Sequence, residues 1–230
     1  MLRDELIPDE NRCMLLKQYY AMNDALLSSI LGLPHGPQRS AICREHNLDV
    51  AIVRTMLDYS RYFEASNIEK QLVIQRESIR GLRVLDFGCL VSDYGLYYAR
   101  RGASVAIYDH DNAVNFAAFR FRRENLHPTI HRIPTAPDVL FRDRDLVVFG
   151  EVLEHLDDTL EIADACIRHD ISYIFTSYYP YGGDRYFALP GHSKLAQGQQ
   201  HKFIELMATH YSPIVTHDRA RLWIRKRLSY

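Results

Sequence analysis

The segment 83–111 constrains the fold more than any other part of this chain. It reads RVLDFGCLVSDYGLYYARRGASVAIYDHD, and its first apolar run ends at Asp86 and Gly88. A helical pattern follows over 94–101, and a second apolar run ends at Asp109. Two apolar runs of strand length, joined by a tight turn and a helix, are typical of adjacent parallel strands. The segment therefore predicts a strand, turn, helix and strand of an α/β sheet.

The same alternation of strand and helix patterns continues to the end of the chain. Strands are predicted over 84–87, 104–108, 145–149 and 173–177, and helices over 94–101, 112–125, 159–168 and 202–209. Two last runs, 214–217 and 221–225, predict an antiparallel edge pair. This pattern favours a mostly parallel sheet that is covered by helices on both faces.

Residues 1–80 show helical patterns only. One helix is predicted over 14–33, before Pro34, and two short helices over 40–46 and 50–63 resemble a helix-turn-helix pair. Asp49 is placed to cap the second of these. We therefore expect a helical cap or dimerisation region over 1–80 and a sheet domain over 81–230.

Composition narrows the setting and the partners. The chain has 230 residues with 28 Lys and Arg against 29 Asp and Glu, so its net charge of −1 gives no global attraction to nucleic acid or to an acidic membrane. Its four cysteines form no CxxC pair, which favours a reducing, cytoplasmic location. No secretory signal is visible, and no apolar run approaches the ~20 residues that a membrane span needs.

Two features of 83–111 suit a nucleoside. Gly88, at the end of the first strand, permits the backbone to approach a ligand closely. Asp109, at the end of the next strand, can accept hydrogen bonds from both hydroxyls of a ribose. The carboxyl ends of these strands are therefore the expected ligand site.

Two longer strings carry a family resemblance. VLDFGC at 84–89, then Asp109, then DLVVFGEVLEHL at 145–156 resemble class I S-adenosylmethionine-dependent methyltransferases, over roughly 81–226. The resemblance implies a Rossmann-like sheet, S-adenosylmethionine as cofactor, and a place for Asp138 beside the adenine. The resemblance implies cofactor contacts for Asp86, Gly88 and Asp109 as well as Asp138. The full set of predicted cofactor-binding residues is Asp86, Gly88, Cys89, Ser92, Asp109, His110, Asp138 and Gly150.

The chain departs from the family in the turn after the first strand. The family reads Asp-x-Gly-x-Gly-x-Gly, and Leu90 and Ser92 stand here where the last two glycines belong. A Cβ hinders backbone approach and makes a positive φ costly. The turn therefore follows another path, binds the cofactor more weakly, or belongs to a catalytically degenerate binding subunit. Ser92 and Asp93 would compensate by hydrogen bonding to the methionine end.

Glu151, Glu154 and His155 form the second chemical motif. On a helix, offsets of three and four would place them on one face, where two carboxylates and an imidazole suit a divalent metal. The set resembles small-RNA 2′-O-methyltransferases and ubiquinone-pathway O-methyltransferases, which implies a downstream histidine. His201, followed by Lys202 and Phe203, matches it better than His192. Two alternatives remain open: His155 as a metal-free base beside Glu151, or a structural motif.

The aromatic loop 177–187 is either a substrate lid or a surface loop packed on the sheet edge. The expected function is methyl transfer to an oxygen or nitrogen of a small-molecule acceptor, with no membrane partner. Balanced charge over 40–63 argues against nucleic acid. A homodimer through the helical region, a metal-dependent RNA 2′-O-methyltransferase and a non-catalytic binding subunit are the alternatives.

Overall fold

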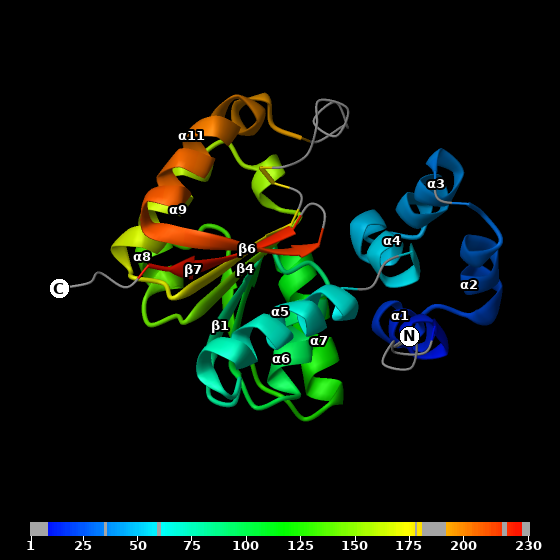
Figure 1. The fold of residues 1–230 in the computed structure, drawn as a ribbon. Helices are drawn as coiled ribbons and strands as arrows, with labels where there is room; N and C mark the ends of the chain where they lie inside the picture. Colours follow the sequence, from blue (N-terminus) through cyan, green and yellow to red (C-terminus); the bar gives the residue numbers. More distant parts are fainter. Residues whose placement is uncertain are drawn as a thin grey trace.

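The computed structural model of the chain describes residues 9–34, 36–58, 61–177, 179–180, 192–217 and 220–226. Within these residues seven strands form one sheet in the order β3-β2-β1-β4-β5-β7-β6. The sheet lies between two groups of helices, with α5, α6 and α7 on one side and α8, α9 and α11 on the other (Figure 1). The pairs among β1 to β5 are parallel, and β7 runs antiparallel to both β5 and β6. The predicted Rossmann-like sheet with an antiparallel edge is therefore confirmed.

Six of the described strands fall close to predicted ranges, although β6 begins three residues earlier than predicted, and β3 was not predicted. The central strands β1, β4 and β5 are mostly apolar because both of their faces are covered by helices, and Asp86 is the buried charge among them. The strands are β1 (Arg83–Phe87), β2 (Ser104–Asp109), β3 (Thr129–Arg132), β4 (Leu146–Gly150), β5 (Tyr173–Ser177), β6 (Tyr211–His217) and β7 (Ala220–Arg225).

Helices cover both faces of the sheet. On one face lie α5 (Tyr62–Arg76), α6 (Asp93–Ala99) and α7 (Asp111–Arg123). On the other lie α8 (Pro137–Phe141), α9 (Thr159–Arg168) and α11 (Lys194–His210). Each face has its own apolar core, with Tyr98 and Phe175 in the first and Phe149 and Trp223 in the second.

The described residues of 9–58 form four helices: α1 (Asp9–Tyr20), α2 (Asp24–Leu31), α3 (Pro37–Glu45) and α4 (Val50–Asp58). The single helix predicted over 14–33 is wrong, because Ala21 takes a left-handed φ of 52° and Asn23 caps a new helix by accepting from Leu26 N–H at 2.8 Å. Asp49 caps α4 as expected, since its carboxylate accepts from Ala51 and Ile52 N–H.

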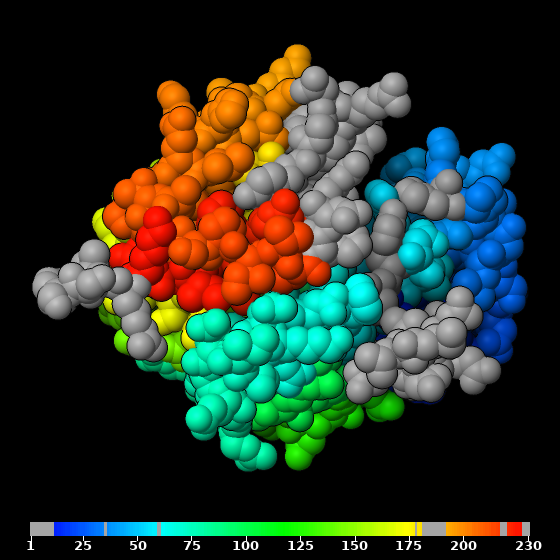
Figure 2. Space-filling model, in the orientation of Figure 1, coloured from blue at the N-terminus to red at the C-terminus, as the bar shows by residue number. Residues whose placement is uncertain are grey.

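The helix α5 packs in the core of the sheet domain and not in the core of α1–α4. Ile68 and Leu72 of α5 are fully buried in the core that contains α6 and β1. On the face seen in Figure 2, α5 (cyan) adjoins β6 and β7 (orange-red to red). The change from helices to strands falls at Arg80 and Gly81, where sequence analysis set its boundary, whereas the change of core falls between α4 and α5.

A third apolar core joins α1–α4 to the sheet domain. Ile30, Ile52 and Met56 of these helices are buried together with Val91 and Phe116. Val91 belongs to the turn after β1, and Phe116 belongs to α7. The helical region therefore packs directly on the turn that sequence analysis singled out. None of the described helices is long and apolar enough to cross a bilayer.

Candidate active site

The sheet order places the candidate site. From β1 the chain winds to β2 and β3 on one side, and it returns to β4 on the other side of β1. Such a reversal opens a crevice between the loops that leave the carboxyl ends of the two strands, and ligands of doubly wound folds bind there. Here those loops begin at Gly88 after β1 and at Glu151 after β4.

The turn after β1 holds left-handed backbone at three positions. Gly88 has φ 68°, Leu90 has φ 46° and Ser92 has φ 55°. The two non-glycine residues thus adopt the conformation for which glycine is favoured, at a cost of roughly 1–2 kcal/mol each. A Cβ on Gly88 would lie 2.3 Å from Cγ2 of Val152, so this position requires glycine both for its φ and for its packing.

Asp86 and Ser92 support this turn through buried hydrogen bonds on its protein side. Asp86 is 2% exposed, and its Oδ2 accepts hydrogen bonds from Ser92 Oγ at 2.7 Å and from Gly95 N–H at 3.0 Å. Burial raises the pKa of the Asp86 carboxyl to about 7. Ser92 is fully buried and donates to Asp86, so its hydroxyl is used inside the protein and not toward a methionine end.

Asp109 lies at the carboxyl end of β2 and holds the same turn from its open side. Its Oδ2 accepts from Leu90 N–H at 2.8 Å, and its Oδ1 accepts from His110 N–H at 2.7 Å. The residue is half-buried. A carboxylate offers about four lone-pair positions, so two such bonds leave room for two further donors.

A buried charge cluster begins α6. Asp93 accepts from Arg12 of α1 at 2.6 Å and from Arg120 of α7 at 2.9 Å, and the three side chains are at most 4% exposed. Burial opposes ionisation of Asp93, but the two guanidinium groups outweigh it and lower its pKa. Arg120 also donates to the Val91 carbonyl. The expected contact of Asp93 with a cofactor is therefore replaced by contacts that attach α1 and α7 to the turn.

An ion pair links the helical side of the crevice to β4. Arg61, the residue before α5, binds the carboxylate of Glu151, which directly follows β4. The Arg61 guanidinium also lies 3.3 Å from Glu64, and the Arg61 N–H donates to Asp93 at 3.1 Å. Glu64 in turn accepts from the Tyr94 hydroxyl. This network joins residues from α5, α6 and the β4 loop.

The structure brings Glu154, His155 and His192 together. One ligand atom from each lies within 4.8 Å of the others, and the two rings meet edge to face with centroids 4.8 Å apart. Glu154 is fully buried and His155 is exposed. Ser193, next to His192, caps α11 and donates its N–H to the Glu154 carbonyl at 2.7 Å. That contact holds His192 close to Glu154 and His155.

Two members of the predicted metal set lie elsewhere. Glu151 takes a left-handed φ of 56°, and only a short 3₁₀ turn, Leu153–His155, follows it. Helical offsets therefore do not apply, and its carboxylate meets Arg61 instead. His201 is exposed within α11, because that helix begins at Lys194 and not after 201. His192 takes the place that sequence analysis gave to His201.

The remaining predicted cofactor residues have these surroundings. The Cys89 side chain is buried in the core beneath the turn, where burial raises its thiol pKa. His110 is exposed at the N-cap position of α7, where its side chain forms no capping hydrogen bond. Gly150 ends β4 beneath the Tyr94 ring, where a Cβ would lie 2.4 Å from Cε2. Asp138 pairs with Arg168 and His169 at the end of α9, so the described contacts do not place it beside a nucleobase.

The aromatic loop is described only in part. Tyr179 is fully buried, and its hydroxyl donates to the Ala196 carbonyl at 3.1 Å and lies 3.2 Å from Thr159 Oγ1. This tyrosine therefore fixes α11 to α9 and does not form part of a lid. Tyr178 and residues 181–187 lie outside the described residues.

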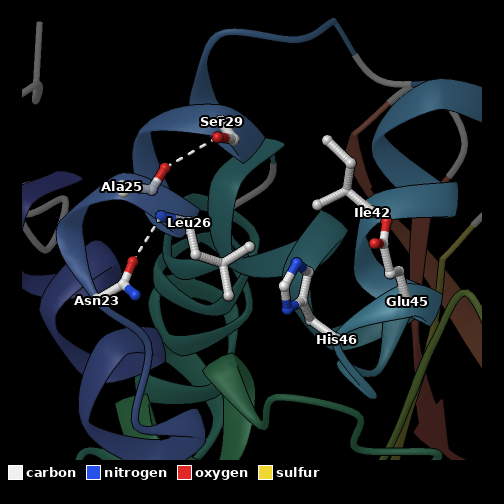
Figure 3. A pocket seen from close by; sticks show the side chains of 7 residues that line it. All are labelled: Asn23, Ala25, Leu26, Ser29, Ile42, Glu45 and His46. Atoms are coloured by element: carbon white, nitrogen blue, oxygen red, sulfur yellow. Dashed lines mark hydrogen bonds between the residues drawn. The ribbon is translucent and has the colours of Figure 1, made fainter.

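A pocket of about 380 Å³ lies between α2 and α3, apart from these residues (Figure 3). Leu26 and the His46 ring face each other across it. The polar groups of Asn23 and Ser29 are bonded to backbone of α2. Its lining is Asn23, Ala25, Leu26, Ser29, Ile42, Glu45 and His46.

Sequence analysis did not assign Arg12, Arg61 or Arg120 to this site, and it ranked His192 below His201. Arg120 had a signal, because it lies one turn after Phe116 on the apolar face of α7. A charge on such a face requires a buried partner. Arg61 had no such signal in the sequence, since its contact with Glu151 depends on how α5 packs against the sheet.

The sheet order and the strand-end turn together define the Rossmann-like methyltransferase fold. No protein-family model and no curated protein sequence matches the chain. Solved structures do match it. Magnesium protoporphyrin IX methyltransferase from Synechocystis PCC 6803, with bound S-adenosylmethionine, shares 17% identity at a TM-score of 0.51, over 94% of this chain and 97% of that one.

Two further structures show the same likeness. A putative O-methyltransferase from Nostoc punctiforme PCC 73102 shares 15% identity at a TM-score of 0.53, over 94% of this chain and 72% of the other. The N-methyltransferase NodS from Bradyrhizobium japonicum WM9, solved with S-adenosylhomocysteine, shares 15% identity at a TM-score of 0.50, over 74% and 91%. At these identities the likeness establishes the fold.

Proposed function

We propose that the chain is an S-adenosylmethionine-dependent methyltransferase that acts on an oxygen or nitrogen of a small molecule. The observation that carries this proposal is the Asp109 carboxylate, which ends β2 and holds the Leu90 N–H of the β1 turn at 2.8 Å, beside the reversal of strand order. The solved O- and N-methyltransferases of the same fold support it.

The residues at the strand ends fit an adenosyl cofactor. Asp109 uses one acceptor position of each oxygen within the protein, so both oxygens keep capacity for the two hydroxyls of a ribose. Gly88 brings the β1 turn close to the β4 loop at Val152, across which the nucleoside would lie. When bound, the cofactor supplies a methyl group on a positively charged sulfur.

The chain's own residues would then position an acceptor and remove its proton. His155 is exposed five residues beyond the end of β4, so its imidazole can take a proton from an acceptor O–H or N–H. One carboxylate oxygen of Glu154 lies within 4.8 Å of a ring nitrogen of each histidine, so the carboxylate can orient the two imidazoles. Most of the rate enhancement would come from holding the acceptor in line with the methyl group.

Binding of S-adenosylhomocysteine, measured by calorimetry, tests the proposal. Asp109→Asn removes the charge that the ribose hydroxyls would use, and charge-assisted bonds contribute about 1.5–3 kcal/mol, so affinity should fall about tenfold or more. Asp111→Asn is the matched control, because Asp111 is an exposed acid two residues on that pairs with Arg132. Equal affinity in both variants, or no binding by the natural chain at millimolar ligand, would refute the proposal.

A metal-dependent activity on the 2′-hydroxyl of an RNA end is the second candidate function. The observation that favours it is the cluster of Glu154, His155 and His192. A carboxylate with two imidazoles is a donor set that divalent transition metals bind well. Through this set a metal would lower the pKa of the hydroxyl to be methylated.

A further inference from the structure

Most backbone donors of the β1 turn are already used within the protein. The acceptors are the carbonyls of Tyr108 and Cys89 and the Asp109 carboxylate, at 2.6–3.2 Å. The N–H groups concerned are those of Gly88, Cys89, Leu90 and Ser92. A ligand carboxylate at this turn therefore has to be held by another donor, and a cation is the strongest kind.

The direction of a bound nucleoside follows from the strand order. With its sugar at Asp109 on β2, the ligand can extend toward β3 or across β1 toward β4. The β3 side presents Ile133, which is 44% exposed and donates its N–H to the Asp109 carbonyl, and this apolar surface suits a flat base. The β4 side, about 10 Å from β2, presents charges.

Those charges are Arg61, Glu64 and Glu151. The Arg61 side chain is 18% exposed, Glu64 is 16% exposed and Glu151 is 30% exposed. One guanidinium thus faces two carboxylates, and this partly open group carries a net charge of −1. The Arg61 N–H is bonded to Asp93 at 3.1 Å, so its backbone is fixed at the start of α6 while its side chain reaches the β4 loop.

We propose that Arg61 and Glu151 form the subsite for the zwitterionic amino-acid end of the adenosyl ligand. Arg61 binds the ligand α-carboxylate through its planar guanidinium, and the Glu151 carboxylate accepts hydrogen bonds from the α-ammonium group. The zwitterion replaces the ion pair between the two side chains, and Glu64 keeps Arg61 oriented throughout. This inference rests on the proposed function and adds a residue from the helical side to the cofactor site.

Two ligands that differ only at this end separate the inference from the proposed function. S-adenosylhomocysteine has the amino-acid end, and 5′-methylthioadenosine lacks it. Arg61→Gln should weaken S-adenosylhomocysteine binding about tenfold or more while changing the affinity for methylthioadenosine less than about twofold. Arg61→Lys, which keeps the charge and loses the fork, should fall between the natural chain and Arg61→Gln.

Controls exclude a general loss of structure. Arg168→Gln removes another ion-paired arginine, on the far end of α9, and should leave both affinities unchanged. Glu151→Gln should reproduce the selective loss seen for Arg61→Gln. Equal losses for both ligands, or no loss for either, would overturn the inference alone. Failure of the natural chain to bind either nucleoside would overturn the proposed function, and the inference with it.

Discussion

Substituting Asp86 by Asn should raise the free energy of unfolding at neutral pH and leave it unchanged at acid pH. Asp86 is buried, and burial raises its pKa from an ordinary value of 3.8 to about 7. Below pH 3.8 the carboxyl is protonated in both the folded and the unfolded chain, so Asp and Asn behave alike. As the pH rises toward 7, the unfolded chain ionises first, and the folded state of the natural protein loses relative stability.

The magnitude follows from the same pKa. Each pH unit between the two values corresponds to about 1.4 kcal/mol, so the natural chain should lose about 4 kcal/mol relative to Asp86→Asn between pH 4 and 7. The amide oxygen of Asn can still accept from Ser92 and Gly95, so the turn keeps its support.

Urea unfolding at intervals between pH 3.5 and 8 measures the free energy of unfolding of both proteins. The difference should be near zero at pH 3.5 and should grow to its full size by pH 8. Asp93→Asn should change the free energy of unfolding in the opposite direction. The pKa of Asp93 is lowered, so the stability that its carboxylate contributes is present above pH 4 and is lost on acidification. If the two proteins show the same dependence of unfolding free energy on pH, burial does not raise the pKa of Asp86.

Two further predictions concern the charge cluster and the histidines. Asp93→Asn leaves two buried guanidinium groups without their carboxylate and should destabilise the fold by about 3–5 kcal/mol in urea unfolding. Arg120→Met keeps the pair of Asp93 with Arg12 and should cost about 1–3 kcal/mol, so a larger loss for Arg120→Met would contradict the reasoning. For the metal, titration calorimetry with Mn²⁺ should show binding by the natural chain and by His201→Ala, and loss of binding by His192→Ala. Absence of binding by the natural chain would exclude a metal.

The sheet could be predicted because its signal is local. A buried parallel strand must be apolar on both faces, so 145–149 and 173–177 stand out from the helical patterns around them. The ligand side of the sheet followed from Gly88 and Asp109, since residues at the ends of neighbouring parallel strands meet at one edge. These inferences need only periodicity and strand order.

The histidine cluster required information that periodicity does not contain. The choice of His201 rested on the two residues that follow it, whereas the position of His192 is set by Ser193, which caps α11 and bonds to Glu154 across 39 residues of sequence. Likewise, Glu151, Glu154 and His155 were expected to share one face at helical spacing, but the left-handed φ of Glu151 turns the backbone before the short 3₁₀ turn begins. Long-range caps and single-residue backbone conformations leave little mark on the sequence around them.

The side chains of the β1 turn have structural roles, both at Val91 and at Leu90 and Ser92, which stand where the family has glycines. Val91 is buried with Phe116 in the core of α1–α4, and burial of a valine side chain contributes about 1.5–3 kcal/mol. Ser92 holds Asp86 in place, and Leu90 packs at the edge of the same core. These contacts offset the roughly 1–2 kcal/mol that each left-handed residue costs. Leu90 therefore contacts the helical region and Ser92 supports the turn, so both residues that stand where the family has glycines make structural contacts.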